Sequence, residues 1–337
     1  MKRLIIILIL LLFPIINRGN VSVSWWQVYF TTPCNNKLQH IQINPEKGII
    51  ELINNASESF YGAFYDVSFD SIVKSLIKAK LRGVDVKIIT ESDNYDRRGI
   101  TDLIRAGIPV VIDKRSGLMH NKFAIIDGRI VWTGSYNLTE NDSKLNNNNA
   151  IAIIFPDLAD IFLRKFNEMF LDNTFGNKSY SGILEFIQQN KIIIDISEIL
   201  VYFSPEDEIE SIIMNLLKDA HSSIHFMAFS FTSDKIGDAM VDMYIKGIKV
   251  TGVFEKIGSG TKYSEFAKMK AAGIPVYLDK NPHMMHHKVI IIDGRIVIIG
   301  SFNFSKNAND NNDENILIIY NETIAREYID ELLRLIK

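Results

Sequence analysis

Cysteine is almost absent from this chain, because Cys34 is the only one in 337 residues. A single cysteine cannot close an internal disulfide, and without a neighbouring cysteine it cannot form a metal-binding knuckle. The chain also lacks an excess of either charge: a formal net charge of -3 and a pI near 6.2 give no global attraction to nucleic acid or acidic lipid. No group of acidic residues and histidines has metal-ligand spacing. Any basic footprint therefore has to be local, and we predict no metal or other cofactor.

Long apolar runs are rare as well, and the one that stands out is Leu4 to Ile16, directly after Lys2 and Arg3. A basic start followed by an apolar stretch of this length is typical of an export signal, and it is short for a membrane span. The small-x-small cleavage pattern is missing, so a retained anchor stays open. We predict residues 1–20 to be a signal peptide or N-terminal anchor outside the fold, and the protein to be secreted or part of the cell envelope.

The chain does contain a long internal repeat. A histidine and a lysine two residues apart are followed by an aspartate and then by Gly-Ser-x-Asn, and this pattern occurs twice at a constant offset. The first copy supplies His120, Lys122, Asp127, Ser135 and Asn137, and the second supplies His286, Lys288, Asp293, Ser301 and Asn303. A period this long indicates a duplicated domain rather than a solenoid. The predicted organisation is repeat 1 at 25–175, a connector at 176–198 without a repeat partner, and repeat 2 at 199–337.

Each copy alternates helix-like and strand-like segments, which predicts an α/β fold with helices packed on a sheet. Asp127-Gly128 and Asp293-Gly294, between β-branched runs, are strong signals for two-residue hairpins. With such turns, Lys122 would lie opposite Thr133, and each histidine would lie opposite the serine of its own copy. Every hairpin would then collect an imidazole, an ammonium, a hydroxyl and an amide on one surface, which suits phosphate binding.

One copy supplies one histidine, but an in-line displacement at phosphorus needs two. One histidine attacks, and the other protonates the leaving oxygen from the opposite side. Two copies related by a pseudo-two-fold axis would bring the hairpins together into one site, and Lys122 and Lys288 would hold the phosphate oxygens.

The doubled H-x-K-x(4)-D with its following G-S-x-N resembles the phospholipase D superfamily, over about residues 25 to 337. The resemblance implies an α/β sandwich in each half, a phosphohistidine intermediate and no required metal. The stretch from Gly300 to Lys306, with Asp313-Glu314-Asn315, is most similar to the endonuclease branch of the superfamily. The resemblance also implies that an acidic residue downstream of the motif bonds to the histidine, and Glu314 occupies that position in the second copy.

Asn148 stands in the first copy where the second copy has Glu314. A carboxylate beside His286 would favour its imidazolium form, which suits a general acid, whereas Asn148 would orient His120 without charging it. The hypothesis is therefore that His120 attacks and His286 protonates.

Other residues have simpler explanations. Asp127 and Asp293 have a sufficient structural reason as turn residues, although direct participation stays open. The Ser-x-Asn residues are expected to bind phosphate or to support the site. His283 and His287 have no partner in the first copy and are interpreted as incidental.

Two functions follow. The first is a phosphodiesterase acting on DNA or RNA, supported by the endonuclease-like stretch and by Lys114, Arg115 and Lys280 just upstream of the histidines. The second is a phospholipase D or phosphatidyl transferase, supported by the export segment and by apolar loops before each histidine. Because both motifs lie in one chain, we expect a monomer. Whether transfer to an alcohol competes with hydrolysis stays open.

Overall fold

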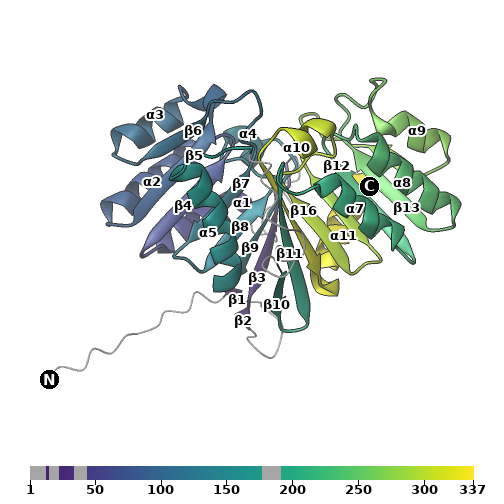
Figure 1. Ribbon diagram of the computed structural model, residues 1–337, viewed down its shortest axis with the longest axis horizontal. Coiled ribbons are helices and arrows are strands. Elements are labelled where there is room, and N and C mark those ends of the chain that lie inside the picture. The colour runs from purple at the N-terminus through teal and green to yellow at the C-terminus, as the bar shows by residue number, and fades with distance from the viewer. Residues whose placement is uncertain (1–12, 15–22, 34–43, 177–190) are drawn as a thin grey trace.

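The computed structural model describes residues 13–14, 23–33, 44–176 and 191–337, which include two large β-sheets flanked by helices (Figure 1). Helix α1 begins where Asn44 caps it and Pro45 fixes the first turn. The helices of repeat 1 are α1 (Pro45–Asn55), α2 (Asp70–Leu81), the short η1 (Ser92–Asn94), α3 (Arg98–Arg105), α4 (Glu140–Lys144) and α5 (Pro156–Phe170). Those of repeat 2 are α7 (Ile209–Lys218), α8 (Asp234–Ile245), α9 (Glu265–Ala271), α10 (Lys306–Asp310) and α11 (Glu322–Ile336).

The first sheet mixes parallel and antiparallel strands. Its members are β3 (Trp26–Phe30), β4 (Ser59–Phe64), β5 (Asp85–Glu91), β6 (Val110–Asp113), β7 (Lys122–Ile126), β8 (Ile130–Gly134) and β9 (Asn149–Ile154). They lie in the order β3-β9-β8-β7-β4-β5-β6, in which β4, β5 and β6 are parallel and the other neighbours antiparallel.

The second sheet repeats this order strand for strand. It contains β10 (Lys191–Ile194), β11 (Ser197–Ser204), β12 (Ser223–Ala228), β13 (Lys249–Phe254), β14 (Val276–Leu278), β15 (Lys288–Ile292), β16 (Ile296–Gly300) and β17 (Glu314–Tyr320). Their order is β10-β11-β17-β16-β15-β12-β13-β14. The added edge strand β10 lies inside the stretch predicted to be a connector. The predicted fold class, an α/β protein of duplicated sandwich domains with a pseudo-two-fold relation, is confirmed.

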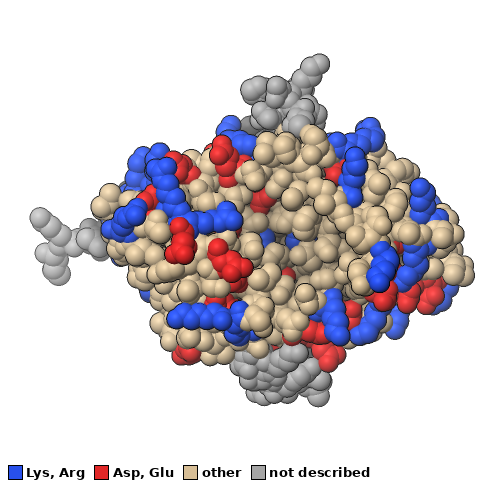
Figure 2. Space-filling model, turned by 90° about the horizontal axis from the view of Figure 1, so that it is seen from above, with Lys and Arg blue, Asp and Glu red and all other residues tan. Residues whose placement is uncertain are grey.

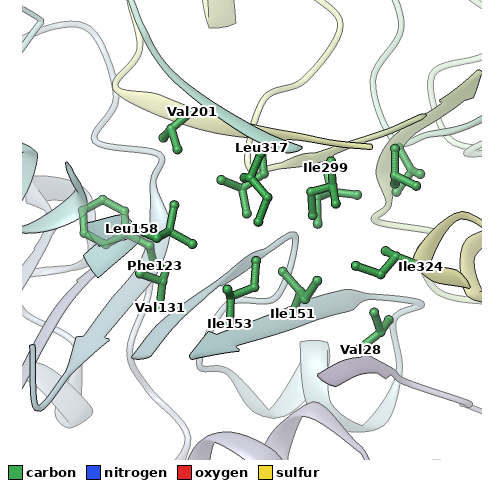
Figure 3. Close-up of a cluster of buried hydrophobic side chains, with 14 of the residues drawn as sticks. Val28, Phe123, Val131, Ile151, Ile153, Leu158, Val201, Ile299, Leu317 and Ile324 are labelled. Atoms are coloured by element: carbon green, nitrogen blue, oxygen red, sulfur yellow. The ribbon is translucent and has the colours of Figure 1, made fainter. Parts of the chain in front are cut away.

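The two sheets face each other across one shared apolar core (Figure 3). Val131 and Ile153 of the first sheet and Ile299 and Leu317 of the second belong to it, together with Ile324 of α11. There are two further cores, one between the first sheet and its outer helices and the other between the second sheet and its outer helices. Because β7 and β15 are buried on both faces, all five residues of each strand are buried. Removal of this apolar surface from water holds the repeats together.

The strand pairing differs from the predicted one by one residue. Phe123, rather than Lys122, pairs with Thr133, and Ile126 pairs with Ile130. Asp127 and Gly128 do adopt the positive φ angles of a tight turn, 51° and 59°. The second hairpin has the same register, with Ile292 paired with Ile296. Three residues therefore connect the strands instead of two, and since a shift of one residue reverses the face of each partner, the predicted pairing of each histidine with the serine of its own copy is wrong.

Several predictions concern residues outside the described part of the chain. The export segment 1–20 is described only at β1 (Phe13–Pro14), which pairs with β2 (Val23–Ser24). Cys34 and most of the predicted connector also lie outside it. Within the described ranges, no helix combines the length and the apolar character needed to cross a bilayer.

Candidate active site

The candidate site lies between the repeats, where the segment after α4 or α10 of one copy reaches the His-Lys segment of the other. The His120 backbone N–H donates to the Asp313 carbonyl at 3.0 Å, and the His286 N–H donates to the Asn147 carbonyl at 2.8 Å. The loops of the two copies are thus exchanged. Viewed from above, a hollow opens in the middle of the molecule, with basic side chains inside it and acidic ones on the rim nearest repeat 1 (Figure 2).

The exchange places Glu314 beside His120, the histidine of the other copy. Both carboxylate oxygens lie 2.8 Å from His120 Nδ1, and Glu314 is fully buried. The prediction that Glu314 serves His286 is therefore wrong. The physical reason is that the backbone pairing between Met119 and Asp313 aligns this loop with the first motif.

His286 is held by neutral acceptors instead. Its Nδ1 lies 3.0 Å from Asn148 Oδ1 and 3.1 Å from the Ser135 carbonyl. Ser135 Oγ donates to the same Asn148 oxygen at 2.9 Å. Asn148 was predicted to orient His120, and like Glu314 it acts on the opposite histidine.

The two lysines occupy equivalent positions in the site. Lys122 Nζ donates to the His120 carbonyl and Lys288 Nζ to the His286 carbonyl, each at 2.8 Å. Both side chains are almost fully buried. Burial lowers the pKa of Lys122 to about 8 and that of Lys288 well below its ordinary value. A bound phosphodiester would supply the negative charge that favours both ammonium forms.

The histidines differ in their electrostatic surroundings. Burial lowers the pKa of His120, and the Glu314 carboxylate opposes that shift. Burial, followed by Lys288 and Lys122, lowers the pKa of His286 well below its ordinary value. His120 therefore binds a proton more readily than His286.

The glycine of each Gly-Ser pair explains how the serines support the site. The carbonyl of Asn149 occupies the space that a Cβ at Gly134 would need, and the carbonyl of Asn315 does the same at Gly300. This close approach lets Ser301 Oγ accept from the Asn315 N–H at 3.0 Å. Ser135 and Ser301 therefore shape the loops behind the histidines.

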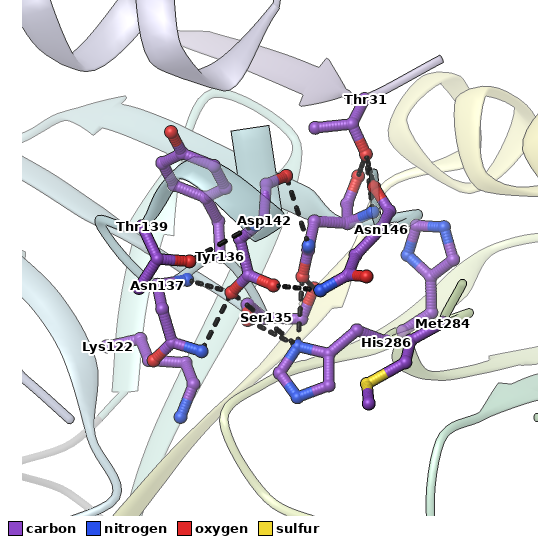
Figure 4. A network of polar contacts seen from close by, with 12 residues as sticks. Thr31, Lys122, Ser135, Tyr136, Asn137, Thr139, Asp142, Asn146, Met284 and His286 are labelled. Atoms are coloured by element: carbon purple, nitrogen blue, oxygen red, sulfur yellow. Dashed lines mark hydrogen bonds and ion pairs between the residues drawn. The ribbon is translucent and has the colours of Figure 1, made fainter. Parts of the chain in front are cut away.

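Asn137 and Asn303 carry the last residues of the motif. The backbone N–H and the Nδ2 group of Asn137 both donate to Asp142 Oδ2 at 2.8 Å (Figure 4). The Oδ1 atoms of Asn137 and Asn303 are buried without a protein partner among the described residues. Asn137 thus fixes a carboxylate that was not singled out in the sequence.

Asp127 and Asp293 lie at the far ends of β7 and β15 from the lysines, so direct participation in the site is contradicted. Asp127 accepts from the backbone N–H groups of the segment 57–59, at 2.8 to 3.1 Å. Asp293 accepts in the same way from the segment 221–223, at 2.7 to 3.1 Å. Both aspartates anchor the loop that leads into β4 or β12.

Two aromatic residues of the site were missed in the sequence. The Tyr65 ring centroid lies 5.2 Å from that of His120, and the Phe229 centroid lies 4.6 Å from that of His286. Lys122 and Lys288 lie over the same two rings, at 5.5 and 4.7 Å. Both aromatic residues directly follow equivalent strands, β4 and β12, and this shared position was the signal available in the sequence.

His287, interpreted as incidental, is a fully buried link between the repeats. Asn149 Nδ2 lies 2.8 Å from its Nδ1, and Glu331 Oε1 lies 3.0 Å from its Nε2. Its side chain therefore contacts α11 through Glu331. His283, by contrast, is exposed.

Several residues that the sequence suggested for substrate contact bind other parts of the protein instead. Arg115 binds Asp113 and Asp313, and Lys280 donates to the carbonyls of Ile336 and Lys337. The apolar loops before the histidines pair with the opposite repeat through the carbonyls of Leu118 and Met284, and Met119 and Met285 are fully buried. Lys114 remains exposed.

In the described ranges no three His, Cys, Asp or Glu side chains gather as metal ligands would, and the metal-free mechanism stays a prediction.

Paired His-Lys motifs at the junction of duplicated α/β domains define a two-histidine phosphodiesterase site. A family model described as "Cardiolipin synthase, PLD-like domain" matches residues 49–170 and 213–336. Since these segments make up well over half of the chain, the protein belongs to this family, within the phospholipase D superfamily, and is a phosphodiesterase of the hydrolase class.

Known proteins with similar sequences or structures include the following. A "Phospholipase D" of Rickettsia conorii is 30% identical over 193 residues, covering 56% of this chain and 96% of that protein. A human "Mitochondrial cardiolipin hydrolase" is 32% identical over 123 residues, or 36% of this chain and 49% of that one. The phosphatidylserine synthase structure of Haemophilus influenzae shares the fold, with a TM-score of 0.66 at 15% identity over 86% of this chain and 83% of that one. Nuc from Salmonella typhimurium is 32% identical with a TM-score of 0.39, covering 41% of this chain and 93% of that one.

Proposed function

We propose that this protein hydrolyses phosphodiester bonds of nucleic acid, without a metal, through a covalent phosphohistidine. The observation that carries the proposal is the meeting of both His-Lys pairs in one buried site, linked across the repeats by the contact between Glu314 and His120. One pair supplies the nucleophile and the other the general acid. The two ammonium groups hold the non-bridging oxygens of the phosphate.

His120 is the nucleophile in this proposal and His286 the general acid. The assignment is the one predicted, but its reason has changed, because Glu314 lies beside His120. The carboxylate accepts from Nδ1–H, which leaves the Nε2 lone pair free to attack, and it stabilises the positive charge that forms on the ring. His286 has a neutral amide beside it, so its imidazolium is the stronger acid.

The choice of nucleic acid is supported by a hollow beside the site that offers both hydroxyl groups and an aromatic ring. A hollow of about 220 Å³ borders Phe229 and is lined by five hydroxyl-bearing residues, Ser230, Thr232, Ser259, Thr261 and Ser264, together with Phe231, Ile257 and Gly258. Hydroxyl groups and an aromatic ring suit a sugar and a base better than an acyl chain. Lys256 and Lys262, on the same loop, are exposed and available for neighbouring phosphates.

A phospholipid is the second candidate substrate. It is favoured by the names of the relatives, a phospholipase D and a cardiolipin hydrolase. Both substrates contain a phosphodiester, so the same histidines would act on either. For this candidate too, transfer to an alcohol in place of water is an alternative outcome at the second step.

The proposal also covers the role of the N-terminal segment and the number of chains in the active protein. Residues 1–20 direct export, which N-terminal sequencing of the protein from cell fractions tests. One chain suffices for activity, since both His-Lys pairs belong to it. Sedimentation of the active protein tests this point, and a dimer as the smallest active species would contradict it.

The decisive experiment offers plasmid DNA, RNA, and phosphatidylcholine or cardiolipin vesicles in parallel to the purified full-length chain in excess EDTA. His120→Ala and His286→Ala serve as controls. We expect nucleic-acid cleavage that both variants lose. Cleavage of lipid alone would move the substrate to the second candidate, and activity that EDTA abolishes would contradict the metal-free mechanism. A wild-type chain that cleaves none of them would overturn the proposed substrates.

A further inference from the structure

Asp142 is a buried carboxylate beside His286, and the mechanism described above gives it no role. It lies in α4, is 3% exposed, and its N–H donates to the Thr139 hydroxyl that caps the helix. Asn137 donates twice to Oδ2, and Asn146 Nδ2 donates to Oδ1 at 2.6 Å (Figure 4). These donors fix the carboxylate in one orientation.

The orientation brings negative charge close to His286. Asp142 Oδ2 lies 4.0 Å from His286 Nδ1, and the Asn148 oxygen contacts the same nitrogen at 3.0 Å. His286 therefore faces its carboxylate across 4.0 Å without a hydrogen bond to it, because its Nδ1 contacts the Asn148 and Ser135 oxygens instead. His120 meets Glu314 directly, at 2.8 Å.

The two copies hold these groups at different positions of the repeat. Asp142 is equivalent to Ala308 in the second copy, and Asn148 is equivalent to Glu314. Each copy thus provides one buried carboxylate for the opposite histidine, but from a different position. Both of these carboxylates, Asp142 and Glu314, act on Lys122 and on Lys288 and favour their ammonium forms.

We propose that Asp142 is the positioning residue of His286, and that its carboxylate favours the charged form of this ring across 4.0 Å, as Glu314 does for His120 in direct contact. The inference rests on the proposed function, because it assumes that His286 is the general acid. The groups that face His286 are Lys288 of β15, Lys122 of β7, His120 of the opposite motif, and Asp142 of α4. Among these, Asp142 supplies the negative charge that opposes the lysines.

The proton balance shows why this charge matters. In the first step His120 Nε2 bonds to phosphorus, the bond to the leaving oxygen breaks, and that oxygen takes the proton from His286 Nε2. In the second step neutral His286 takes a proton from the attacking water, and the bond between His120 and phosphorus breaks, its electron pair returning to Nε2. His286 must therefore be charged at the start, in a buried place that disfavours charge.

The test compares Asp142→Asn with the double variant Asp142→Asn/Asn148→Asp, in which the carboxylate moves to the position that it has in the second copy. kcat/KM is measured against pH on plasmid DNA and on phosphatidylcholine vesicles, and the burst on bis(p-nitrophenyl) phosphate is recorded in parallel. A p-nitrophenolate leaves without protonation, so that burst does not need the general acid. Glu46→Gln is the matched control, because Glu46 binds Lys144 of the same helix.

We expect Asp142→Asn to lower kcat/KM about 10-fold or more at pH 7 and to move the low-pH limb, which reports the histidine with the lower pKa, down by about one pH unit. The burst should change less than about threefold. The double variant should restore the limb, and Glu46→Gln should match the wild type.

An unmoved limb in Asp142→Asn, or equal losses on both kinds of leaving group, would overturn the inference. If Asp142→Asn does not fold, the single variant Asn148→Asp decides the question. A carboxylate placed 3.0 Å from His286 Nδ1 must raise the pKa of this histidine, so the limb that reports His286 must move to higher pH. A wild-type chain that cleaves neither DNA nor lipid would instead contradict the proposed function.

Discussion

The two halves of the site share one backbone arrangement and differ in chemistry. Each histidine donates its backbone N–H to the opposite loop, and each lysine bonds to the carbonyl of its own histidine. Yet His120 contacts a carboxylate, while His286 contacts an amide. Duplication has thus built a symmetric frame, and a few substitutions behind it have made the two histidines unequal.

This inequality matches what an in-line displacement requires. The attacking ring gains positive charge and benefits from a carboxylate, whereas the ring that donates a proton benefits from a weaker hold on it. A strictly symmetric site would make both histidines equally good at both tasks. Glu314 differs from its equivalent Asn148, and Asp142 differs from its equivalent Ala308. Substitutions at these positions therefore test whether the two histidines really have different roles.

The largest effect is expected from removal of each histidine. His120→Ala and His286→Ala should each lower cleavage of an unactivated diester by about 10³-fold or more. With bis(p-nitrophenyl) phosphate the variants should separate: His286→Ala should still release one burst of p-nitrophenol and accumulate an adduct on His120, and His120→Ala should do neither.

Rapid-mixing absorbance measures this burst, and mass spectrometry of the quenched protein locates the adduct. The wild-type chain, quenched in the same way, is the control. An adduct on His286 would reverse the two roles, while leaving the shared site intact.

A smaller loss is expected from Glu314→Gln, which makes the two histidine environments alike. The variant should lose about 10²-fold in kcat, because the charge that forms on His120 is no longer balanced. Since Glu314 raises the pKa of His120 against its burial, removing the charge lowers that pKa. The high-pH limb of kcat/KM, which reports the histidine with the higher pKa, His120, should then move to lower pH.

Steady-state rates from pH 4 to 9 test this expectation. Glu322→Gln, a change at an exposed carboxylate of the same repeat, is the control and should behave as the wild type. If the limb instead moves to higher pH, the limb does not reflect the titration of His120.

The sequence was sufficient for the fold and for the two His-Lys pairs at the centre of the site. The doubled motif, read at a constant offset, predicted two α/β domains that share His120, Lys122, His286 and Lys288, and the structure brings all four together. That inference was possible because it needed only local periodicity and the requirement for two histidines at one phosphorus.

The partners of the histidines could not be predicted in the same way. Glu314 and Asn148 each lie within one copy, so a sequence argument pairs them with the nearest motif. Which motif they reach is decided by the backbone exchange between the copies, through Asp313 and Asn147. Likewise, one extra residue in each hairpin loop changed the register, although the Asp-Gly signal itself was correct.

The aromatic walls of the site allow a third, weaker contrast. Phe229 borders the hollow of about 220 Å³, whereas Tyr65, which contacts His120, is not one of the residues that line it. If this hollow binds a nucleotide, Phe229→Ala should raise KM for DNA about 5- to 10-fold and Tyr65→Ala less, because stacking contributes about 1 to 3 kcal/mol per base. Initial rates on oligonucleotides measure both, with Phe229→Tyr, which keeps the ring, as the control. Equal changes in both alanine variants would place the nucleotide elsewhere.

The smallest effect on catalysis is expected at Asp127 and Asp293, where the copies are most alike. Each carboxylate holds backbone N–H groups at the far end of its hairpin, so Asp127→Ala and Asp293→Ala should leave kcat within about twofold and reduce the free energy of unfolding by about 1 to 3 kcal/mol.

The pH dependence follows from the pKa of Asp293, which these hydrogen bonds lower to about 2 against the opposing effect of burial. Its contribution to stability is present above the unfolded pKa of about 3.9 and is lost as the pH falls through about 2. The difference in urea midpoint between wild type and Asp293→Ala should therefore be full at pH 7 and shrink below about pH 3. A large loss of kcat in a folded Asp293→Ala variant would mean that this aspartate acts on the reaction after all, and that the functional asymmetry extends beyond the histidines.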